Sequence, residues 1–161
     1  MDDVDDAFAI YGDPEVARWL SGTPVASREE QAEKLQAIIT KYEAIAHTGL
    51  GFWAAEEKSS NLVIGAALLK EITFSEGVVG DPEVEVGWHL GQAYWGEGFG
   101  TEIGHACMKR GAYLPRIIAV AYPENVRSLR IMEKCGLQEV GLSDRYYDRI
   151  VMLYEWRAAG C

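Results

Sequence analysis

The sequence predicts one domain of the α/β (α+β) class, with helices flanking a mixed central sheet of about six strands. Three observations support this prediction. The length of 161 residues fits a single domain, so we expect residues 1–161 to fold as one unit. Hydrophobic residues make up 48% and charged residues 25% of the chain, which is typical of globular proteins. Periodic apolar patterns then predict, in order, helices, three strands, a helix, a strand, a helix and two strands.

The N-terminal part of the chain is predicted to be helical. Residues 3–11 and 13–20 are expected to form two short helices, the second capped by its first residue. A longer helix is predicted over 27–47, because Ser27 and Glu30 match a capping box. The apolar residues of this helix recur every three or four positions, as one helix face requires: Ala32, Leu35, Ile38, Ile39 and Tyr42.

Strands and two helices make up the rest of the chain. Strands are predicted at 52–56, 62–73, 84–90, 116–122, 137–141 and 146–156, and helices from the glycine-rich stretch 96–100 to about 112 and over 125–134. The segment 84–90 alternates between apolar and polar residues, which predicts a strand with two distinct faces. Glu85 is expected on the face opposite Val84 and Val86. Tyr146, Tyr147 and Asp148 are expected between the last two strands, where ordinary strand packing is favoured for the tyrosines and a role as an acid is the alternative.

The charge of the chain excludes several classes of partner. The formal net charge is −10, which disfavours nucleic acid and anionic membrane surfaces. No apolar run approaches the roughly 18 residues of a membrane span, and the acidic start is unlike a signal peptide. We therefore expect a cytoplasmic protein. Residues 1–80 carry a net charge of −8 and residues 81–161 a net charge of −2.

Cysteines and histidines give no sign of a disulfide scaffold or a metal site. The cysteines are odd in number and widely spaced, and the histidines lack ligand spacing. They are Cys107, Cys135 and Cys161, and His47, His89 and His105. We expect free thiols, with Cys107 in the core, and no metal.

The most informative segment is the glycine-rich turn Trp95-Gly96-Glu97-Gly98-Phe99-Gly100-Thr101, which joins a predicted strand to a helix. Glycine lets a ligand approach the backbone, and the first N–H groups of a helix form an anion site. The turn matches neither the dinucleotide fingerprint nor a Walker loop. It predicts a phosphate or pyrophosphate site of another kind, with a plain tight turn as the alternative.

Four segments, in order along the chain, resemble the GNAT superfamily of acetyltransferases and, within it, the ribosomal-protein N-terminal (alanine/serine) acetyltransferases. They span residues 11–16, 85–90, 94–102 and 125–137. The resemblance implies the GNAT fold and an acetyl-CoA-dependent N-acetyltransferase that works by direct transfer in a ternary complex. The strand that usually opens this fold is missing from the pattern. A neighbouring strand could then pair with a second copy in a homodimer.

The resemblance also implies site residues. Backbone amides of residues 96–101 would hold the pyrophosphate of acetyl-CoA, and the strand ending at Leu90 would diverge from its neighbour and bind the pantetheine arm. The cofactor-binding set comprises Trp88, His89, Leu90, Trp95, Gly96, Glu97, Gly98, Phe99, Gly100, Thr101, Asn125, Ser128 and Lys134. Glu85 is the first candidate for the base that deprotonates the amine, with His89 or a water relay as alternatives, and Ser128 is the candidate acid for the thiolate.

The acceptor is expected to be a primary amine, and a protein or peptide N-terminus is favoured. At neutral pH, deprotonating an α-amine costs about 1 kcal/mol, whereas a lysine amine costs about 4–5 kcal/mol. The acidic first half of the chain is expected to flank this cationic amine. Two alternatives stay open: acetylation of a small amine such as a polyamine, an aminoglycoside or an amino acid, and an acyl-CoA-binding module without turnover.

Overall fold

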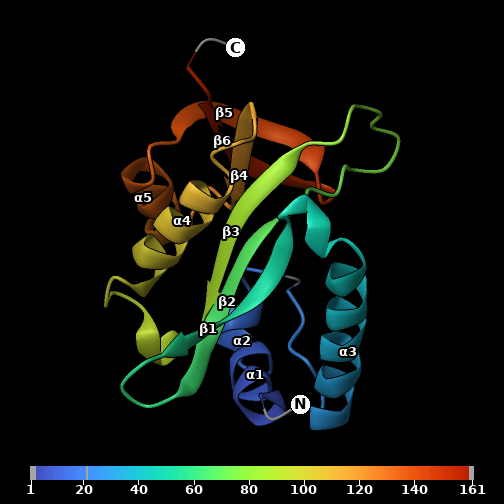
Figure 1. Cartoon of the computed structure of the whole chain (residues 1–161), viewed down its shortest axis with the longest axis vertical. Helices are drawn as coiled ribbons and strands as arrows, with labels where there is room; N and C mark the ends of the chain where they lie inside the picture. The colour runs from blue at the N-terminus through green and yellow to red at the C-terminus, as the bar shows by residue number, and fades with distance from the viewer. Residues whose placement is uncertain (1–2, 21, 160–161) are drawn as a thin grey trace.

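A computed structural model describes residues 3–20 and 22–159. Its helices are α1 (Val4–Tyr11), α2 (Pro14–Ala17), α3 (Arg28–Ala44), α4 (Phe99–Arg110) and α5 (Val126–Lys134), with short 3-10 turns η1 (Ala46–Thr48) and η2 (Gln92–Tyr94). Its strands are β1 (Gly51–Glu57), β2 (Leu62–Glu71), β3 (Val84–Leu90), β4 (Arg116–Ala121), β5 (Gln138–Tyr146) and β6 (Arg149–Arg157). The predicted element order and the mixed six-stranded sheet with flanking helices are confirmed (Figure 1). None of the described helices has the length and apolar character needed to cross a bilayer.

The sheet has the strand order β1-β2-β3-β4-β6-β5. All neighbouring strands are antiparallel except β3 and β4, which run parallel and pair at Glu85 and Ile118. Beyond this pair, the ends of β3 and β4 lie on either side of a cavity that residues of both strands line. The gap between the two parallel strands therefore positions the site.

The N-terminal helices begin as their sequences predict. Asp13 caps α2 by accepting a hydrogen bond from the Glu15 amide at 2.8 Å. Ser27 caps α3 by accepting one from the Glu30 amide at 3.2 Å, and the Glu30 carboxylate accepts one from the amide of Ala26 at 2.9 Å. Helix α2 ends at Ala17, earlier than predicted, because the chain turns there and directs Trp19 and Leu20 into the cavity.

Helices cover both faces of the sheet. On one face α1 contacts β2, and the carboxylate of Asp6 accepts a hydrogen bond from the Val63 amide at 2.9 Å. On the other face α4 and α5 enclose the larger core, which contains Leu69, Val86, Cys107, Ile117, Ala119, Met132, Cys135, Leu137 and Tyr154. Cys107 thus lies in the core, as expected.

Strand β1 forms one edge of the sheet, and within residues 3–20 and 22–159 no strand precedes α1. Helix α3 stands beside β1 (Figure 1). The apolar stripe of α3 is only partly buried, since Ile39 is 40% exposed.

The connection between β5 and β6 differs from the prediction. Strand β5 continues to Tyr146, and the chain reverses over Tyr147 and Asp148, whose φ angles are +60° and +55°. Two consecutive positive φ angles are typical of the tight turn that suits the twist of a hairpin, but they usually belong to Gly, Asn or Asp. A tyrosine in this conformation is strained, so neighbouring structure must stabilise it.

That stabilisation comes from the loop between β2 and β3, residues 72–83. The Ser75 amide donates a hydrogen bond to the carbonyl of Arg145 at 2.8 Å, and the Ser75 hydroxyl donates to the carbonyl of Asp144 at 2.7 Å. The Glu76 amide donates to the Asp148 carboxylate at 2.7 Å. This loop holds the β5–β6 turn in place and directs the Tyr147 side chain into the cavity.

Candidate active site

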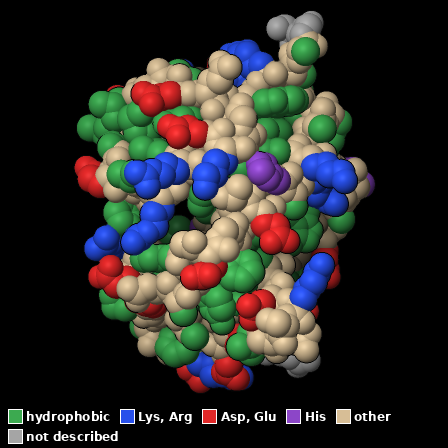
Figure 2. Space-filling model, turned by 90° about the vertical axis from the view of Figure 1, so that its left-hand side faces the viewer, with side chains coloured by type: hydrophobic (Ala, Val, Ile, Leu, Met, Phe, Trp, Pro, Cys, Tyr) green, Lys and Arg blue, Asp and Glu red, His purple; other side chains and the backbone are tan. Residues whose placement is uncertain are grey.

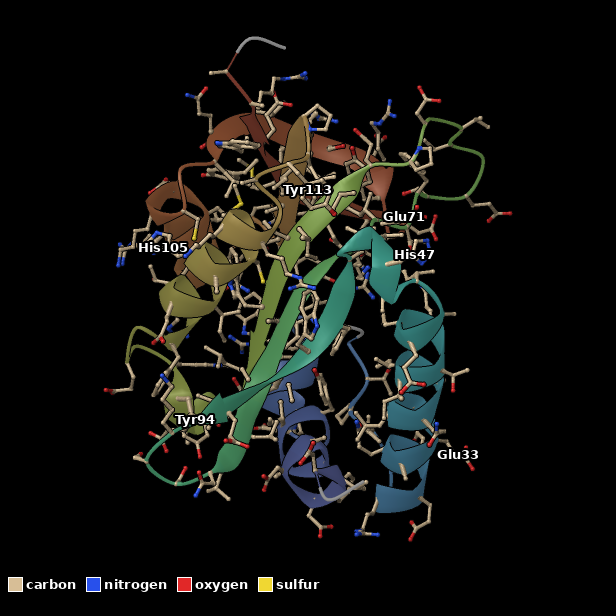
Figure 3. The ribbon with its side chains drawn as sticks, in the orientation of Figure 1. Glu33, His47, Glu71, Tyr94, His105 and Tyr113 are labelled. Carbon is tan, nitrogen blue, oxygen red and sulfur yellow. The ribbon has the colours of Figure 1, made fainter. Side chains whose placement is uncertain are left out.

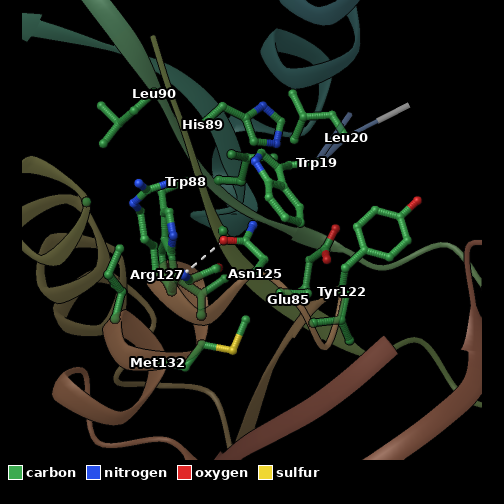
Figure 4. A pocket seen from close by; sticks show the side chains of 18 of the residues that line it. Trp19, Leu20, Glu85, Trp88, His89, Leu90, Tyr122, Asn125, Arg127 and Met132 are labelled. Carbon is green, nitrogen blue, oxygen red and sulfur yellow. Dashed lines mark hydrogen bonds between the residues drawn. The ribbon is translucent and has the colours of Figure 1, made fainter. Parts of the chain in front are cut away.

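A cavity of about 840 Å³ lies between β3 and β4 (Figure 4). It collects nearly all the residues that the sequence pointed to. The predicted residues that line it are Glu85, Trp88, His89, Leu90, Trp95, Gly96, Gly98, Gly100, Thr101, Asn125, Ser128 and Lys134. Glu97 and Phe99 of the predicted set are not among its lining residues, and Phe99 instead makes an edge contact with Tyr94.

One end of the cavity is built by the glycine turn. Gly96 and Gly98 have φ angles of +89° and +93°, and a Cβ atom added at either would meet nothing within 4 Å. Helix α4 begins directly after Gly98, and the first N–H groups of a helix have no acceptor four residues earlier, although the Thr101 N–H donates to the Gly98 carbonyl at 3.0 Å. The Trp95 indole donates a hydrogen bond to the Leu90 carbonyl at 2.9 Å, which fixes the turn to the end of β3.

Helix α5 forms the neighbouring wall. The Asn125 side chain accepts a hydrogen bond from the Ser128 amide at 3.2 Å and so caps the helix, while both residues face the cavity. The Arg127 guanidinium lies over the Trp95 ring at 5.3 Å. Lysine and arginine side chains gather in a band across the face that carries α4 and α5, although the whole chain is acidic (Figure 2).

This end of the cavity fits an anionic group such as the pyrophosphate of coenzyme A. Open glycine backbone, the start of α4 and the positive charges of α5 converge on one place. The cations that line it are Arg127, Arg130 and Lys134.

The other end of the cavity holds a buried polar cluster of Lys70, Glu85 and Tyr147. Glu85 is 7% exposed; it forms an ion pair with Lys70 and accepts a hydrogen bond from the Tyr147 hydroxyl. The Lys70 ammonium also donates to the Tyr147 oxygen at 2.8 Å. Burial, followed by the charge of Glu85, raises the pKa of Tyr147, so this tyrosine stays protonated and remains a donor.

Sequence reasoning missed two members of this cluster. Tyr147 does not pack as an ordinary strand residue, so that expectation was wrong. Lys70 was not identified, because only the pairing of β2 with β3 brings it opposite Glu85. The strained turn at Tyr147 carries no glycine or asparagine that would have revealed it. Arg149, which lines the cavity at the start of β6, also went unrecognised.

His89 lies in a ring of aromatic side chains. Its Nδ1 is 3.1 Å from the Tyr11 hydroxyl, and it makes edge contacts with the rings of Tyr11 and Phe52, both at 5.8 Å between centroids. Burial, followed by the positive charge of Lys70, lowers the pKa of His89 to about 4. The imidazole is therefore neutral at pH 7.

This shift predicts an acid-sensitive fold. In the unfolded chain His89 titrates near 6.5, and in the folded chain near 4, so the unfolded state binds the extra proton first as the pH falls. The contribution of His89 is fully present above pH 6.5 and is lost toward pH 4, for a loss of up to about 3 kcal/mol. Urea titrations of the wild type and of His89→Gln at pH 7 and pH 4.5 measure it. We expect a flatter pH dependence in the variant, and equal slopes would contradict the assignment.

No cysteine takes part in the cavity wall as far as the chain is described. Cys107 and Cys135 are buried, and burial raises the pKa of Cys107 to about 11, so it stays a thiol. Cys161 lies outside the described residues. Within the described ranges, no group of three or more His, Cys, Asp or Glu side chains could hold a metal ion. His47 and His105 lie on opposite sides of the molecule (Figure 3).

The acidic first half of the chain does not supply the charge of the cavity. Among the described residues that line it, the only charged side chain from residues 1–80 is the cation Lys70. The acidic groups of α1 and α3 are directed elsewhere. Asp5, for example, forms an ion pair with Arg28, and Glu30 forms one with Lys34. The expectation that acidic helices flank a cationic acceptor is therefore wrong for this cavity.

Comparison with known proteins places this geometry in a family. Residues 1–138 match the family described as an acetyltransferase (GNAT) domain. An uncharacterized N-acetyltransferase, p20, of Bacillus licheniformis is 27% identical over 150 residues, which cover 91% of this chain and 79% of that protein.

Solved structures share the fold at low identity. A GNAT-family acetyltransferase from Bacillus anthracis superposes with a TM-score of 0.72 at 20% identity, covering 96% of this chain and 87% of its own. The ribosomal-protein-S5-alanine acetyltransferase of Vibrio fischeri gives 0.67 at 18% identity, with 98% and 90% covered. The aminoglycoside acetyltransferase AAC(6')-Ib in complex with coenzyme A gives 0.71 at 16% identity, with 97% and 90% covered. The family match over most of the chain, together with this shared fold, shows that the chain belongs to the GNAT family of acetyltransferases.

Proposed function

We propose that this protein is an acetyl-CoA-dependent N-acetyltransferase that transfers the acetyl group directly to a primary amine in a ternary complex. One observation carries the proposal. A single cavity connects an open glycine turn with cationic surroundings to a buried carboxylate, Glu85. The first end suits the phosphates of coenzyme A, and the second suits an amine that must lose a proton.

Two side chains of the cavity have proposed roles in proton transfer. Glu85 receives a proton from the amine as its nitrogen bonds to the acetyl carbon. Ser128, at the start of α5, gives a proton to the sulfur as the carbon–sulfur bond breaks and takes a replacement proton from solvent. The Lys70 ammonium and the Tyr147 hydroxyl contact the Glu85 carboxylate and hold it in place at this end of the cavity.

The cost of deprotonating the amine bears on the identity of the acceptor. Deprotonating an α-amine costs about 1 kcal/mol at neutral pH, against about 4–5 kcal/mol for a lysine side chain. We therefore favour the α-amine of a protein or peptide N-terminus. The structural neighbour that acts on ribosomal protein S5 is consistent with this choice, whereas the aminoglycoside acetyltransferase keeps small amines as the second candidate.

Calorimetry and a thiol-release assay test the proposal. We expect acetyl-CoA to bind with a Kd below about 1 mM and coenzyme A to be released when a peptide amine is added. Gly98→Val should weaken binding at least about tenfold, because a side chain at a positive φ is strained and would enter the phosphate end of the cavity. Gly77→Val is the matched control, since Gly77 has a φ of +76°, equally open surroundings and no place in the cavity wall.

The outcomes separate the alternatives. Absence of acetyl-CoA binding, or equal binding by both glycine variants and the wild type, would contradict the proposed site. Binding without thiol release from any amine would indicate an acyl-CoA-binding module. Release with spermidine or kanamycin, but not with peptides, would indicate a small-molecule acetyltransferase.

A further inference from the structure

The charges in the cavity are opposite in sign to those of the whole protein. The chain has a formal net charge of −10. Among the described residues that line the cavity, however, five are cationic and one is acidic. They are Lys70, Arg127, Arg130, Lys134 and Arg149, and Glu85.

These cations fall into two groups. Three of them, Arg127, Arg130 and Lys134, lie on α5 beside the glycine turn. Their positive charges match the phosphates of coenzyme A that the proposed function places there. Lys70 and Arg149 lie at the other end. Lys70 forms an ion pair with the Glu85 carboxylate, and Arg149 begins β6, the strand that follows Tyr147. Among the described residues, two cations, Lys70 and Arg149, and one acid, Glu85, therefore lie at the acceptor end.

The one acid among the described residues of this end already has a cationic partner. Glu85 forms its ion pair with Lys70, whose side chain is only 17% exposed. A polycationic acceptor would thus find no uncompensated acid among the described residues of the cavity wall. The surrounding wall is apolar and aromatic, with Trp19, Leu20 and Tyr122, so charges here are weakly screened (Figure 4).

Arg149 is positioned to meet an acceptor. Its guanidinium donates a hydrogen bond to the Leu20 carbonyl and lies over the Tyr122 ring at 5.5 Å. These contacts fix it between the α2 side of the cavity and the end of β4. A planar guanidinium held against an aromatic ring is well suited to bind a carboxylate.

We infer that the acceptor carries an anionic group, a carboxylate, close to its primary amine, and that Arg149 is the residue that selects it. The inference rests on the proposed N-acetyltransferase function. The amine is placed at Glu85, and the carboxylate lies at Arg149. The same chemistry occurs in a free amino acid and in a peptide whose second residue is acidic.

Matched acceptors test the inference in the thiol-release assay with saturating acetyl-CoA. One pair is L-alanine and L-alaninamide. The other set consists of the peptide amides Ala-Glu-Ala-Ala, Ala-Gln-Ala-Ala and Ala-Lys-Ala-Ala, with spermidine as a polycation. We expect kcat/KM for the carboxylate-bearing member of at least one set to exceed that of its neutral partner about tenfold. The set that shows the preference identifies the source of the carboxylate.

Two variants separate charge from structure. Arg149→Gln should abolish the preference, whereas Arg149→Lys should keep part of it, because the lysine retains the charge but loses the fork of donors. A purely structural role through Leu20 would make both variants behave alike. Both should bind acetyl-CoA within about twofold of the wild type, because Arg149 lies away from the phosphate end.

Several results would overturn the inference. They are equal use of charged and neutral acceptors, a preference for the lysine peptide or spermidine, and a carboxylate preference that survives in Arg149→Gln. Failure of the proposed function looks different, since acetyl-CoA would then not bind or no amine would be acetylated at all.

Discussion

Replacing Glu85 with glutamine is expected to lower kcat/KM by about 10²–10⁴-fold, the usual contribution of a general base. Glutamine has nearly the same shape and can still accept a hydrogen bond from Tyr147, but it cannot take a proton from the amine. The Kd for acetyl-CoA should stay within about twofold, because Glu85 lies at the end of the cavity away from the glycine turn. Steady-state kinetics with a peptide acceptor and calorimetry measure the two quantities.

Glu83 provides a matched control two residues away. Like Glu85, it forms an ion pair with a cation and accepts a hydrogen bond from a tyrosine. Its partners are Arg116 and, at 2.7 Å, Tyr146, and it does not line the cavity. Glu83→Gln should therefore lose stability in the same manner and keep turnover within a few-fold. If Glu85→Gln retains wild-type turnover, or if both variants lose it equally, Glu85 is not the base. The double variant Glu85→Gln/Lys70→Met should recover stability without activity, because it removes the unpaired ammonium.

Replacing Gly65 with alanine is expected to destabilise the fold by about 3 kcal/mol, near the upper end for overpacking. A Cβ atom at Gly65 would lie 2.1 Å from the carbonyl oxygen of His89 and 2.8 Å from a methyl group of Leu90. The backbone of β3 would have to move away from β2, since a carbonyl cannot rotate aside as a flexible side chain can. Urea unfolding monitored by tryptophan fluorescence gives the change in the free energy of unfolding.

Gly87 is the control for this substitution. It lies on β3 opposite Leu68, and its Cβ atom would lie 3.7 Å from the Leu68 Cβ, an ordinary contact distance. Gly87→Ala should therefore cost less than about 1 kcal/mol. Equal stability of the two variants would show that β2 and β3 can separate at Gly65 without penalty. Because His89 and Leu90 line the cavity, Gly65→Ala should also weaken acetyl-CoA binding.

Local patterns in the sequence predicted most of the fold. The alternation of apolar and polar residues predicted the bounds of β3 correctly, and the capping residues predicted the starts of α2 and α3. These signals depend on residues a few positions apart, which a single sequence displays directly. The turn between β5 and β6 was missed for the opposite reason. Its conformation at Tyr147 depends on hydrogen bonds that Ser75, some 70 residues earlier in the chain, donates to the Asp144 carbonyl and accepts from the Asp148 amide.

The two ends of the cavity also differ in how far the sequence alone predicts them. The glycine turn is one continuous segment, so its place beside the cavity could be predicted from the order of residues 95–101, although Glu97 and Phe99 do not line the cavity. The acceptor end is assembled from β2, β3 and β6 and from the turn before β6. Lys70, Tyr147 and Arg149 come together only through strand pairing, and each is unremarkable in its own stretch of sequence. No motif in the sequence marks these three residues.

The strained turn at Tyr147 also has a consequence for how the molecule opens. A non-glycine residue at positive φ is unfavourable by about 1–3 kcal/mol, and here hydrogen bonds from an exposed loop hold it. The tip of that loop is open to solvent, with Val79 at 92% exposure, whereas Ser75 is buried. The loop and the turn should therefore come apart together as one cooperative unit, well before the core under α4 and α5. Backbone amides of the loop and turn should then exchange hydrogen faster than those of the core under α4 and α5. The acceptor end of the cavity would be the less rigid of the two.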